Sequence, residues 1–436
     1  MILRFSTMLR TLLISACLAS ALQAAPNVVM IISDDQAWND YSFMGHPHIK
    51  TPHIDKLAEQ SLTFTRGYVP DSLCRPSLAS MISGLYPHQH RISGNDPKPA
   101  NGKRPWNVKK NPQYDKLREK LISHIDTVPS LPRILAKQGY MSHQSGKWWE
   151  GNFSRGGFTA GMTRGFPQPG GRHGDDGLKI GREGLKPVFD FIDTAQKAKR
   201  PFFIWYAPFL PHSPHNPPER ILKKYISKTD SIHQARYWAM CEWFDETCGE
   251  LLGYLDRQKL SENTIVIYVC DNGWIQRPDK KSYALRSKRS PYDGGVRTPI
   301  MIRWPGKVKP KMDRKTLVNS IDIAPTILQA CQVKPHAEMT GVNLLDAQQL
   351  EKRKAIFGEV FEHDVVDIDR PAASLNYRWC VEGDWKLILP SSRLPKEKPE
   401  LFNVTLDPYE KKELSAEHQE IVQKMTTQIN NWWPGK

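Results

Sequence analysis

The sequence lacks the features that would place it in a membrane or in a small disulfide-bonded scaffold. Beyond residue 24, no apolar run is long enough to cross a bilayer. Cysteine is scarce, with 7 among 436 residues, and a chain of this length can build its core without disulfides. Cys241 and Cys248 would lie about 10 Å apart along an expected helix, too far for a bridge. We therefore expect a globular chain with no membrane span and no disulfide framework.

Acidic residues are also in deficit, because 46 Asp and Glu stand against 61 Lys and Arg, a formal charge of +15. Such an excess attracts anionic partners, and charge alone does not choose between nucleic acid, a membrane surface and an acidic glycan. The basic residues are scattered, however, and no nucleic-acid recognition motif occurs. We expect no nucleic-acid partner.

The first 24 residues have the pattern of a secretory signal peptide. Arg4 and Arg10 precede a short apolar stretch at 12–22, and small residues surround Ala24. This pattern predicts export to the periplasm or the exterior. Residues 14–17 also resemble a lipoprotein cleavage box ending at Cys17, but the apolar run is so short that anchoring at Cys17 ranks below simple export.

Strand and helix patterns alternate along most of the chain. Runs that are apolar on both faces indicate parallel strands buried between helix layers, and they occur at 27–36, 201–208 and 263–273. Helical patterns lie at 53–61, 127–139, 185–197 and 236–258. The alternation predicts an α/β fold built on a large doubly wound sheet.

The character of the chain changes near residue 346. Short alternating runs at 356–409 predict a small antiparallel sheet, and a helix is expected near 413–433. We predict an α/β domain at 25–345 and a smaller C-terminal α+β subdomain at 346–436.

Two long loops interrupt the α/β pattern. One, at 94–112, is basic and proline-rich, and the other, at 151–184, is glycine-rich and carries Arg172 and His173 among other basic residues. Loops of this length in a compact domain are usually functional or disordered. We expect the second loop to contribute to substrate binding.

Polar pairs follow two of the predicted buried strands. Asp34 and Asp35 end the first, while Asp271 and Asn272 end the third. Each pair alone would read as a turn or a helix cap. Ligands of open α/β sheets, however, bind beyond the carboxyl ends of strands, and oxygen donors suit a hard cation such as Ca²⁺ or Mg²⁺. Together the pairs predict a cation site.

Cys74 lies at the expected start of a helix, because Pro76 is a favoured residue of a first helical turn. The helix dipole and free amides there stabilise negative charge. A buried, inert cysteine is the alternative. A thiolate enzyme would need a histidine partner, for which His88 and His90 are candidates. With Cys74 set aside, five cysteines remain outside the leader, an odd number that argues against complete pairing.

The segment "CRPSLASMISG" resembles the signature of the type I sulfatases, the formylglycine-dependent members of the alkaline phosphatase superfamily. Cys74, Pro76, Ser77, Ser83 and Gly84 match it without gaps. Further matches occur in the family's order along nearly all of the chain after the leader: the two polar pairs, "GKW" at 146–148, Pro211-His212, Lys288 before "RSPYDGGVRTP", and "LFNVTLDPYE" at 401–410.

The resemblance implies an alkaline phosphatase-like mixed sheet and a set of residue roles. Cys74 would be converted to formylglycine by a formylglycine-generating enzyme and would attack sulfur. Asp34, Asp35, Cys74, Asp271 and Asn272 would hold Ca²⁺, with Mg²⁺ as an alternative. Lys147 and Lys288 would offset the sulfate charge, and Asp271 would act as a base. His212 would protonate the departing alcohol, with His215 as the alternative acid.

The chain departs from the family pattern at two positions. Leu78 stands where the family has an arginine that lies above the nucleophile and takes part in recognition by the maturation enzyme. Trp149 replaces a histidine that assists sulfate release, and an indole cannot accept that proton. His88, His90, Arg286 and the loop arginines are candidate substitutes.

We therefore expect an exported sulfatase that hydrolyses sulfate esters, either of a small molecule or of a polysaccharide. A sulfated carbohydrate is favoured by export, positive charge and the loops. His215, Arg172, His173 and Trp149 are the expected substrate-binding residues. The alternatives are a phosphodiesterase or phosphonate hydrolase of the same superfamily, and a non-catalytic, cation-dependent glycan-binding relative in which Cys74 remains a thiol.

Overall fold

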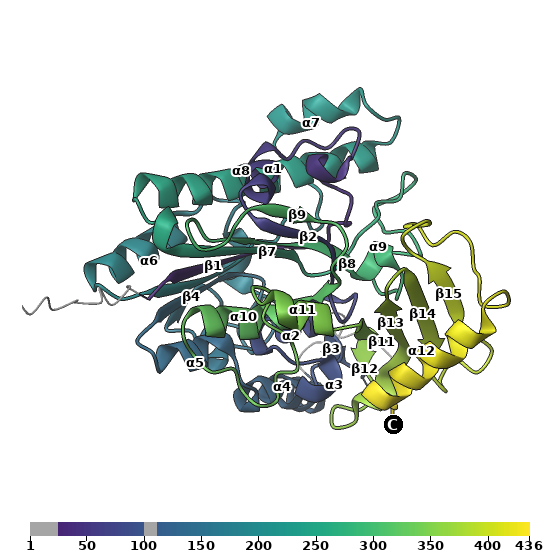
Figure 1. The fold of residues 1–436 in the computed structure, drawn as a ribbon. Helices are drawn as coiled ribbons and strands as arrows, with labels where there is room; N and C mark the ends of the chain where they lie inside the picture. The colour runs from purple at the N-terminus through teal and green to yellow at the C-terminus, as the bar shows by residue number, and fades with distance from the viewer. Residues whose placement is uncertain (1–24, 100–110) are drawn as a thin grey trace, which may run out of the picture.

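Figure 1 shows the fold in the computed structural model, which describes residues 25–99 and 111–436. The expected leader at 1–24, with Cys17, lies outside the described residues, as does the middle of the loop at 94–112. None of the helices in the two described ranges is both long and apolar enough to cross a membrane.

A nine-stranded mixed sheet forms the centre of the molecule, in the order β10-β2-β8-β7-β1-β6-β4-β5 with β9 beside β2. The central strands β6, β1 and β7 are parallel neighbours and are buried on both faces, as their apolar runs predicted. Antiparallel β8 joins β7 to β2. The strands are β1 (Asn27–Ser33), β2 (Leu62–Tyr68), β4 (Met141–Gly146), β5 (Ala160–Gly161), β6 (Phe202–Ala207), β7 (Thr264–Cys270), β8 (Arg297–Arg303), β9 (Lys311–Asp313) and β10 (Val318–Asn319).

Helices cover both faces of this sheet, which confirms the predicted doubly wound α/β architecture. Two separate apolar clusters fill the spaces between the helices and the two sheet faces. In Figure 1 one layer lies above the sheet and the other below. The upper layer holds α1 (Pro52–Glu59), α6 (Lys186–Lys197), α7 (Glu219–Ile226) and α8 (Ile232–Arg257), and the lower layer holds α2 (Cys74–Ser83), α3 (Pro87–His90), α4 (Pro112–Thr127), α5 (Leu131–Ala136) and α10 (Ile323–Ala330).

Two helices begin at other residues than expected, because local capping and backbone conformation set their first residue. The helix expected from 236 begins at Ile232, because the Ser231 side chain accepts a hydrogen bond from the Gln234 amide. The helix expected from 127 begins only at Leu131, since Val128 and Ser130 are extended.

The C-terminal part forms a second, antiparallel sheet of order β11-β13-β14-β15, with α12 packed on it (Figure 1). This confirms the expected small sheet and terminal helix, although the helix begins at Gln419 rather than near 413. The domain boundary at 346 stays a prediction. The elements are α11 (Ala347–Lys352), β11 (Ala355–Phe361), β13 (Leu375–Glu382), β14 (Trp385–Pro390), β15 (Glu400–Asn403) and α12 (Gln419–Trp432).

Side chains of the small sheet belong to the apolar cluster below the main sheet, and polar contacts also join the two parts of the protein. Buried Lys386 of β14 forms ion pairs with Asp293 of α9 (Asp293–Val296) and with Glu410, at 2.8 and 2.9 Å. In addition, β12 (Asp364–Val365) pairs in parallel with β3 (Asp96–Pro97), far earlier in the chain. The second contact brings a C-terminal segment to the side of the sheet where α2 begins.

The cysteines of the described residues make no disulfide. All six, including Cys241 and Cys248, are buried free thiols. No disulfide therefore stabilises the described residues, in agreement with the odd cysteine count.

Candidate active site

The polar pairs after β1 and β7 lie side by side, because these strands are parallel and Ser33 stands opposite Cys270. The Asp35 amide donates to Asp271 Oδ1 at 3.1 Å, and Asn272 Nδ2 donates to Asp35 Oδ1 at 2.7 Å. Asp35 takes a left-handed backbone conformation, with φ of 64°, at this strand end. The result is a buried group of three carboxylates and one amide.

One oxygen of each of these four side chains is buried without a hydrogen-bond partner among the described residues: Asp34 Oδ2, Asp35 Oδ2, Asp271 Oδ2 and Asn272 Oδ1. A buried oxygen left unpaired is costly. Four such oxygens, three of them from carboxylates, form the donor set that Ca²⁺ and Mg²⁺ prefer. The residues therefore fit a divalent cation. We call these four side chains the oxygen cage.

Two buried lysines contact the cage. Lys147, just after β4, places Nζ 2.7 Å from Asp34 Oδ1 and 3.7 Å from Asp271 Oδ2. Lys288 places Nζ 2.5 Å from Asp35 Oδ1 and 3.1 Å from Cys74 Sγ. Two ammonium groups against three carboxylates leave a deficit of positive charge, which a divalent cation would reverse.

The surroundings shift the pKa values of the cage carboxyl groups in different directions. Burial raises the pKa of Asp34 and Asp271, and repulsion from the neighbouring carboxylates adds to it. Burial acts on Asp35 in the same direction, but Lys288, His212 and Lys147 outweigh it and lower the pKa of this carboxyl. Asp35 is therefore the firmly ionised member.

Cys74 opens α2, with its thiol buried beside the cage. Burial raises the pKa of this thiol to about 12, against the attraction of Lys147 and Lys288. The unmodified side chain is therefore a neutral thiol at neutral pH, despite its position at a helix N-terminus and its contact with Lys288.

His212 follows β6 and lies on the other side of Asp35. Its Nδ1 donates to the Ser213 carbonyl at 2.6 Å, which leaves Nε2 at 3.3 Å from Asp35 Oδ2. The ring stacks on Phe209, with 4.2 Å between centroids. Burial lowers the pKa of this imidazole well below its usual value. The backbone bond thus fixes Nε2 as the nitrogen directed toward the cage.

These groups open into one cavity of about 250 Å³. It brings Cys74, Lys147, Lys288 and His212 together with three of the four expected substrate-binding residues. We call it the primary cavity, and it is lined by Cys74, Asn95, Lys147, Trp149, Arg172, His173, His212, Trp274, Tyr283, Lys288, Arg289 and His363.

Trp149 forms one wall of the primary cavity with two residues of the loop at 151–184. The Arg172 guanidinium lies 4.6 Å from the Trp149 ring and forms an ion pair with buried Asp96. The His173 ring lies 5.1 Å from Trp149, its carbonyl accepts from the Trp148 amide at 3.1 Å, and its Nδ1 has no partner among the described residues. The loop therefore supplies an imidazole beside Trp149.

Leu78 is buried in the apolar cluster below the sheet and does not line the primary cavity. The arginine that α2 does carry, Arg75, is directed elsewhere. Its guanidinium donates two hydrogen bonds to buried Glu150, at 2.8 and 2.6 Å, and one to the Asn95 carbonyl at 3.1 Å. Lys288 is thus the cation of the described residues that contacts the Cys74 sulfur.

Several candidates lie away from the primary cavity. His215 lines a neighbouring cavity instead. His88 bonds Glu359, and His90 bonds Ser80 Oγ at 3.0 Å. Neither histidine is therefore the partner of the Cys74 thiol. Arg286 donates to the Glu410 carbonyl and does not replace the arginine absent at Leu78.

The structure adds wall residues that sequence reasoning missed. Trp274 and Tyr283 follow the second polar pair and pack 5.0 Å apart, ring to ring. Asn95 and His363 approach within 3.3 Å through β3 and β12. Trp274 directly follows "DNG", and this position could have predicted it as a wall residue. No motif surrounds Asn95 or His363.

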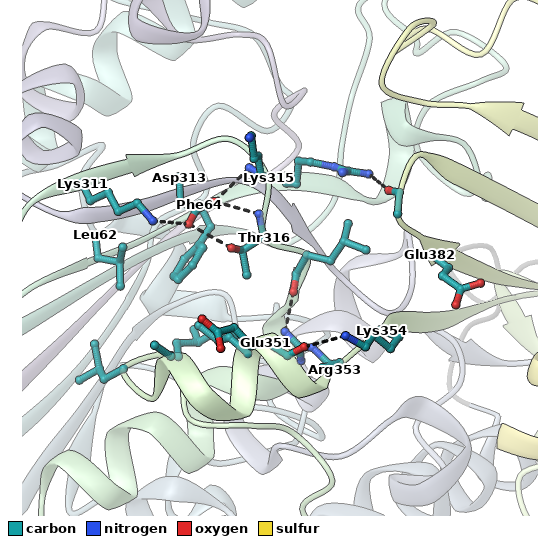
Figure 2. Close-up of a pocket in the computed structure, with 17 residues that line it drawn as sticks. Leu62, Phe64, Lys311, Asp313, Lys315, Thr316, Glu351, Arg353, Lys354 and Glu382 are labelled. Atoms are coloured by element: carbon teal, nitrogen blue, oxygen red, sulfur yellow. Dashed lines mark hydrogen bonds and ion pairs between the residues drawn. The ribbon is translucent and has the colours of Figure 1, made fainter.

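A larger cavity, of about 630 Å³, lies at the edge of the sheet beside β9 and α11 (Figure 2). Several of its charged groups are engaged by ion pairs or hydrogen bonds. Lys311 pairs with Asp313 (Figure 2), Arg353 donates to the Leu317 carbonyl, and Arg66 donates to the Gly383 carbonyl. It holds no cysteine, histidine or group of unpaired carboxylates, and size alone does not make it the reactive site.

Comparison with protein families agrees with the fold. The family model described as Sulfatase matches residues 26–333, and that described as N-sulphoglucosamine sulphohydrolase, C-terminal, matches residues 282–433. The chain belongs to the sulfatase family, within the alkaline phosphatase superfamily.

Curated relatives include carbohydrate sulfatases. Human N-acetylgalactosamine-6-sulfatase is 26% identical over 369 residues, covering 75% of this chain and 66% of its own length, so the match spans slightly less than two thirds of that enzyme. The N-acetylgalactosamine-6-O-sulfatase of Bacteroides thetaiotaomicron is 24% identical over 495 residues, covering 92% of each chain.

Solved structures share the fold. Ps i-CgsB in complex with k-i-k-neocarrahexaose superposes with a TM-score of 0.72 at 22% identity, covering 94% of each chain. The phosphonate monoester hydrolase of Agrobacterium radiobacter reaches 0.67 at 17% identity, covering 93% of this chain and 95% of that one. The fold is therefore common to enzymes named for different reactions.

Proposed function

We propose that this protein is an exported sulfatase that hydrolyses sulfate esters of carbohydrates, with Cys74 converted to formylglycine. One observation carries the proposal: Cys74 lies in the same cavity as two buried lysines and a histidine and beside four unpaired oxygens. A structural cysteine would need none of these neighbours.

The oxygen cage would hold Ca²⁺ or, alternatively, Mg²⁺. When bound, the cation offsets charge on the nucleophile and on the sulfate oxygens. Formylglycine at position 74, in its hydrated form, supplies a hydroxyl nucleophile. Both groups fit residues that are present, because Cys74 Sγ belongs to a cluster of possible metal ligands with Asp34, Asp35 and His212.

The remaining side chains bind the ester and move protons. Lys147 and Lys288 border the cavity with their ammonium groups, where they would bind sulfate oxygens and offset developing charge. Asp271 would accept the proton of the attacking hydroxyl. His212, held by the Nδ1 bond to Ser213, would act in its protonated form, which the nearby Asp35 carboxylate favours, and would deliver the Nε2 proton to the departing sugar oxygen.

The carbohydrate assignment is supported by relatives, charge and cavity walls. The relatives include enzymes named for N-acetylgalactosamine 6-sulfate. The charge of +15 favours an anionic substrate. Trp149, Trp274 and Tyr283 supply apolar ring faces to the primary cavity. Export to the periplasm or exterior, and maturation by a formylglycine-generating enzyme, are parts of the same proposal.

A second candidate is a non-catalytic glycan-binding protein that keeps the Cys74 thiol. The observation in its favour is that α2 directs no arginine toward Cys74, because Leu78 is buried in the core and Arg75 is bound to Glu150. A phosphodiesterase or phosphonate hydrolase would use a similar cage, and the fold is shared with such an enzyme.

Peptide mass analysis of the protein from its native host separates these candidates. Conversion of Cys74 replaces H₂S by O in the peptide that contains it, and we expect this mass change together with sulfate release from N-acetylgalactosamine 6-sulfate. Phosphate and phosphonate monoesters of the same sugar test the superfamily alternative. A fully unmodified Cys74 would refute the formylglycine mechanism.

A further inference from the structure

A second cavity, of about 360 Å³, adjoins the primary cavity and is lined by no acidic residue. The loop after His212, the first turns of α8 and the segment before Tyr283 form its walls. Two cationic side chains, Arg236 and Lys281, and two histidines, His215 and His233, line it. We call it the basic cavity.

The cations of the basic cavity have no acidic partner. Within residues 25–99 and 111–436, neither Arg236 nor Lys281 forms an ion pair, whereas nearby cations do. Arg220 and Lys224 of α7 pair with Glu246 and Glu242 of α8. The cavity therefore holds two cations that have no acidic partner among the described residues.

The histidines add polar atoms without partners. His215 Nε2 and His233 Nδ1 are buried and make no hydrogen bond among the described residues. Burial lowers the pKa of His215 to about 4, so that its ring is neutral near pH 7. His233 lies in the first turn of the 26-residue helix α8, where backbone amides favour an anion. An imidazole N–H can donate to an anion whether or not the ring is charged.

The two cavities share a wall. His212 lines the primary cavity and the next residue, Ser213, lines the basic one. The ring of Trp274, in the primary cavity, lies 5.8 Å from the ring of His215. Arg182 fixes this wall, because it donates to the His212 carbonyl at 3.0 Å and to Asn216 Oδ1 at 2.7 Å.

We propose that the basic cavity binds a second acidic group, a sulfate or a carboxylate, of the same carbohydrate whose sulfate ester lies in the primary cavity. This inference rests on the proposed function and specifies its substrate class, a glycan with at least two acidic groups. Arg236 and Lys281 would bind the second group by charge-assisted hydrogen bonds. Both residues determine specificity and take no part in the reaction.

Calorimetric binding to the Cys74→Ala protein tests the inference, because it needs no turnover. The probes are two disaccharides built on N-acetylgalactosamine 6-sulfate, one with a uronic acid as second sugar and one with the neutral hexose of the same configuration. We expect the acidic disaccharide to bind about tenfold more tightly. Arg236→Gln with Lys281→Gln should remove that difference, and Lys280→Gln, an exposed lysine outside the cavity, should preserve it.

The outcomes separate this inference from the proposed function. Equal affinities for the two sugars, or a difference that survives Arg236→Gln with Lys281→Gln, would overturn the basic cavity as a subsite even if the active protein releases sulfate. A difference that these two substitutions abolish would support it even if no sulfate is released, in which case only the catalytic proposal fails. A melting temperature unchanged by the substitutions shows that the variant is folded.

Discussion

The oxygen cage contacts two lysines that line the primary cavity, and the wall around Trp149 lines the same cavity, but the two are built differently. The cage comes from the ends of two central, adjacent strands, so its positions follow from the register of the sheet. The Trp149 wall combines a strand end with Arg172 and His173 of a long loop. The cage residues agree with the resemblance to the family, whereas Trp149 in the wall departs from it. The agreement therefore lies where the sheet sets the positions, and the departure lies next to a long loop.

Substitution of the nucleophile should have the largest effect. Cys74→Ala removes the side chain that contacts Lys288 and the source of formylglycine. We expect sulfate release to fall by about 10⁴-fold or more, measured by ion chromatography with N-acetylgalactosamine 6-sulfate. Turnover equal to that of the wild-type protein would exclude Cys74 as the nucleophile.

Removal of the cation should come next. Chelation would leave four buried oxygens unpaired, so EDTA should abolish sulfate release and lower the melting temperature, and Ca²⁺ or Mg²⁺ should restore both. Asp34→Asn should raise the metal concentration needed for half-maximal activity about 100-fold. Asp176→Asn, at an exposed site, is the control and should need the same metal concentration as the wild-type protein. Full activity in EDTA would refute the cage as a cation site.

The Arg75 to Glu150 pair, which adjoins Trp149 in the chain, tests how much a buried ion pair next to the wall contributes to stability. Glu150→Gln leaves Arg75 as a buried cation with an incomplete partner, and breaking such a pair costs about 3 kcal/mol in unfolding free energy. Arg155→Gln breaks the more exposed pairs with Glu119 and Asp126 and should cost about 1 kcal/mol or less. Urea unfolding followed by circular dichroism measures both, and equal losses would contradict the burial argument.

The smallest effect is expected at His173. If its unpaired imidazole assists proton transfer beside Trp149, His173→Gln should lower kcat about tenfold with little change in KM. Trp149→His in that background should restore part of kcat, because it returns an imidazole to the same wall. An unchanged kcat in His173→Gln would assign this residue to packing alone.

The sheet and the cage were accessible from sequence because both depend on local patterns. Apolar runs that end in Asp34-Asp35 and Asp271-Asn272 specify strand, strand end and ligand type together. The walls were not accessible in this way. The loop that carries His173 has no periodicity that gives its path, and the partner of Arg75 depends on packing between α2 and the end of β4. His363 comes beside Asn95 only through pairing across 268 residues.

The pairing of β12 with β3 has a consequence for the order of assembly. His363, which lines the primary cavity, directly precedes β12, so one wall is synthesised long after Cys74, the cage and both lysines. Contacts between residues so distant in sequence form slowly. A growing chain therefore carries every group of the reactive centre before it can enclose them. The primary cavity is completed only after His363 and β12 have been synthesised.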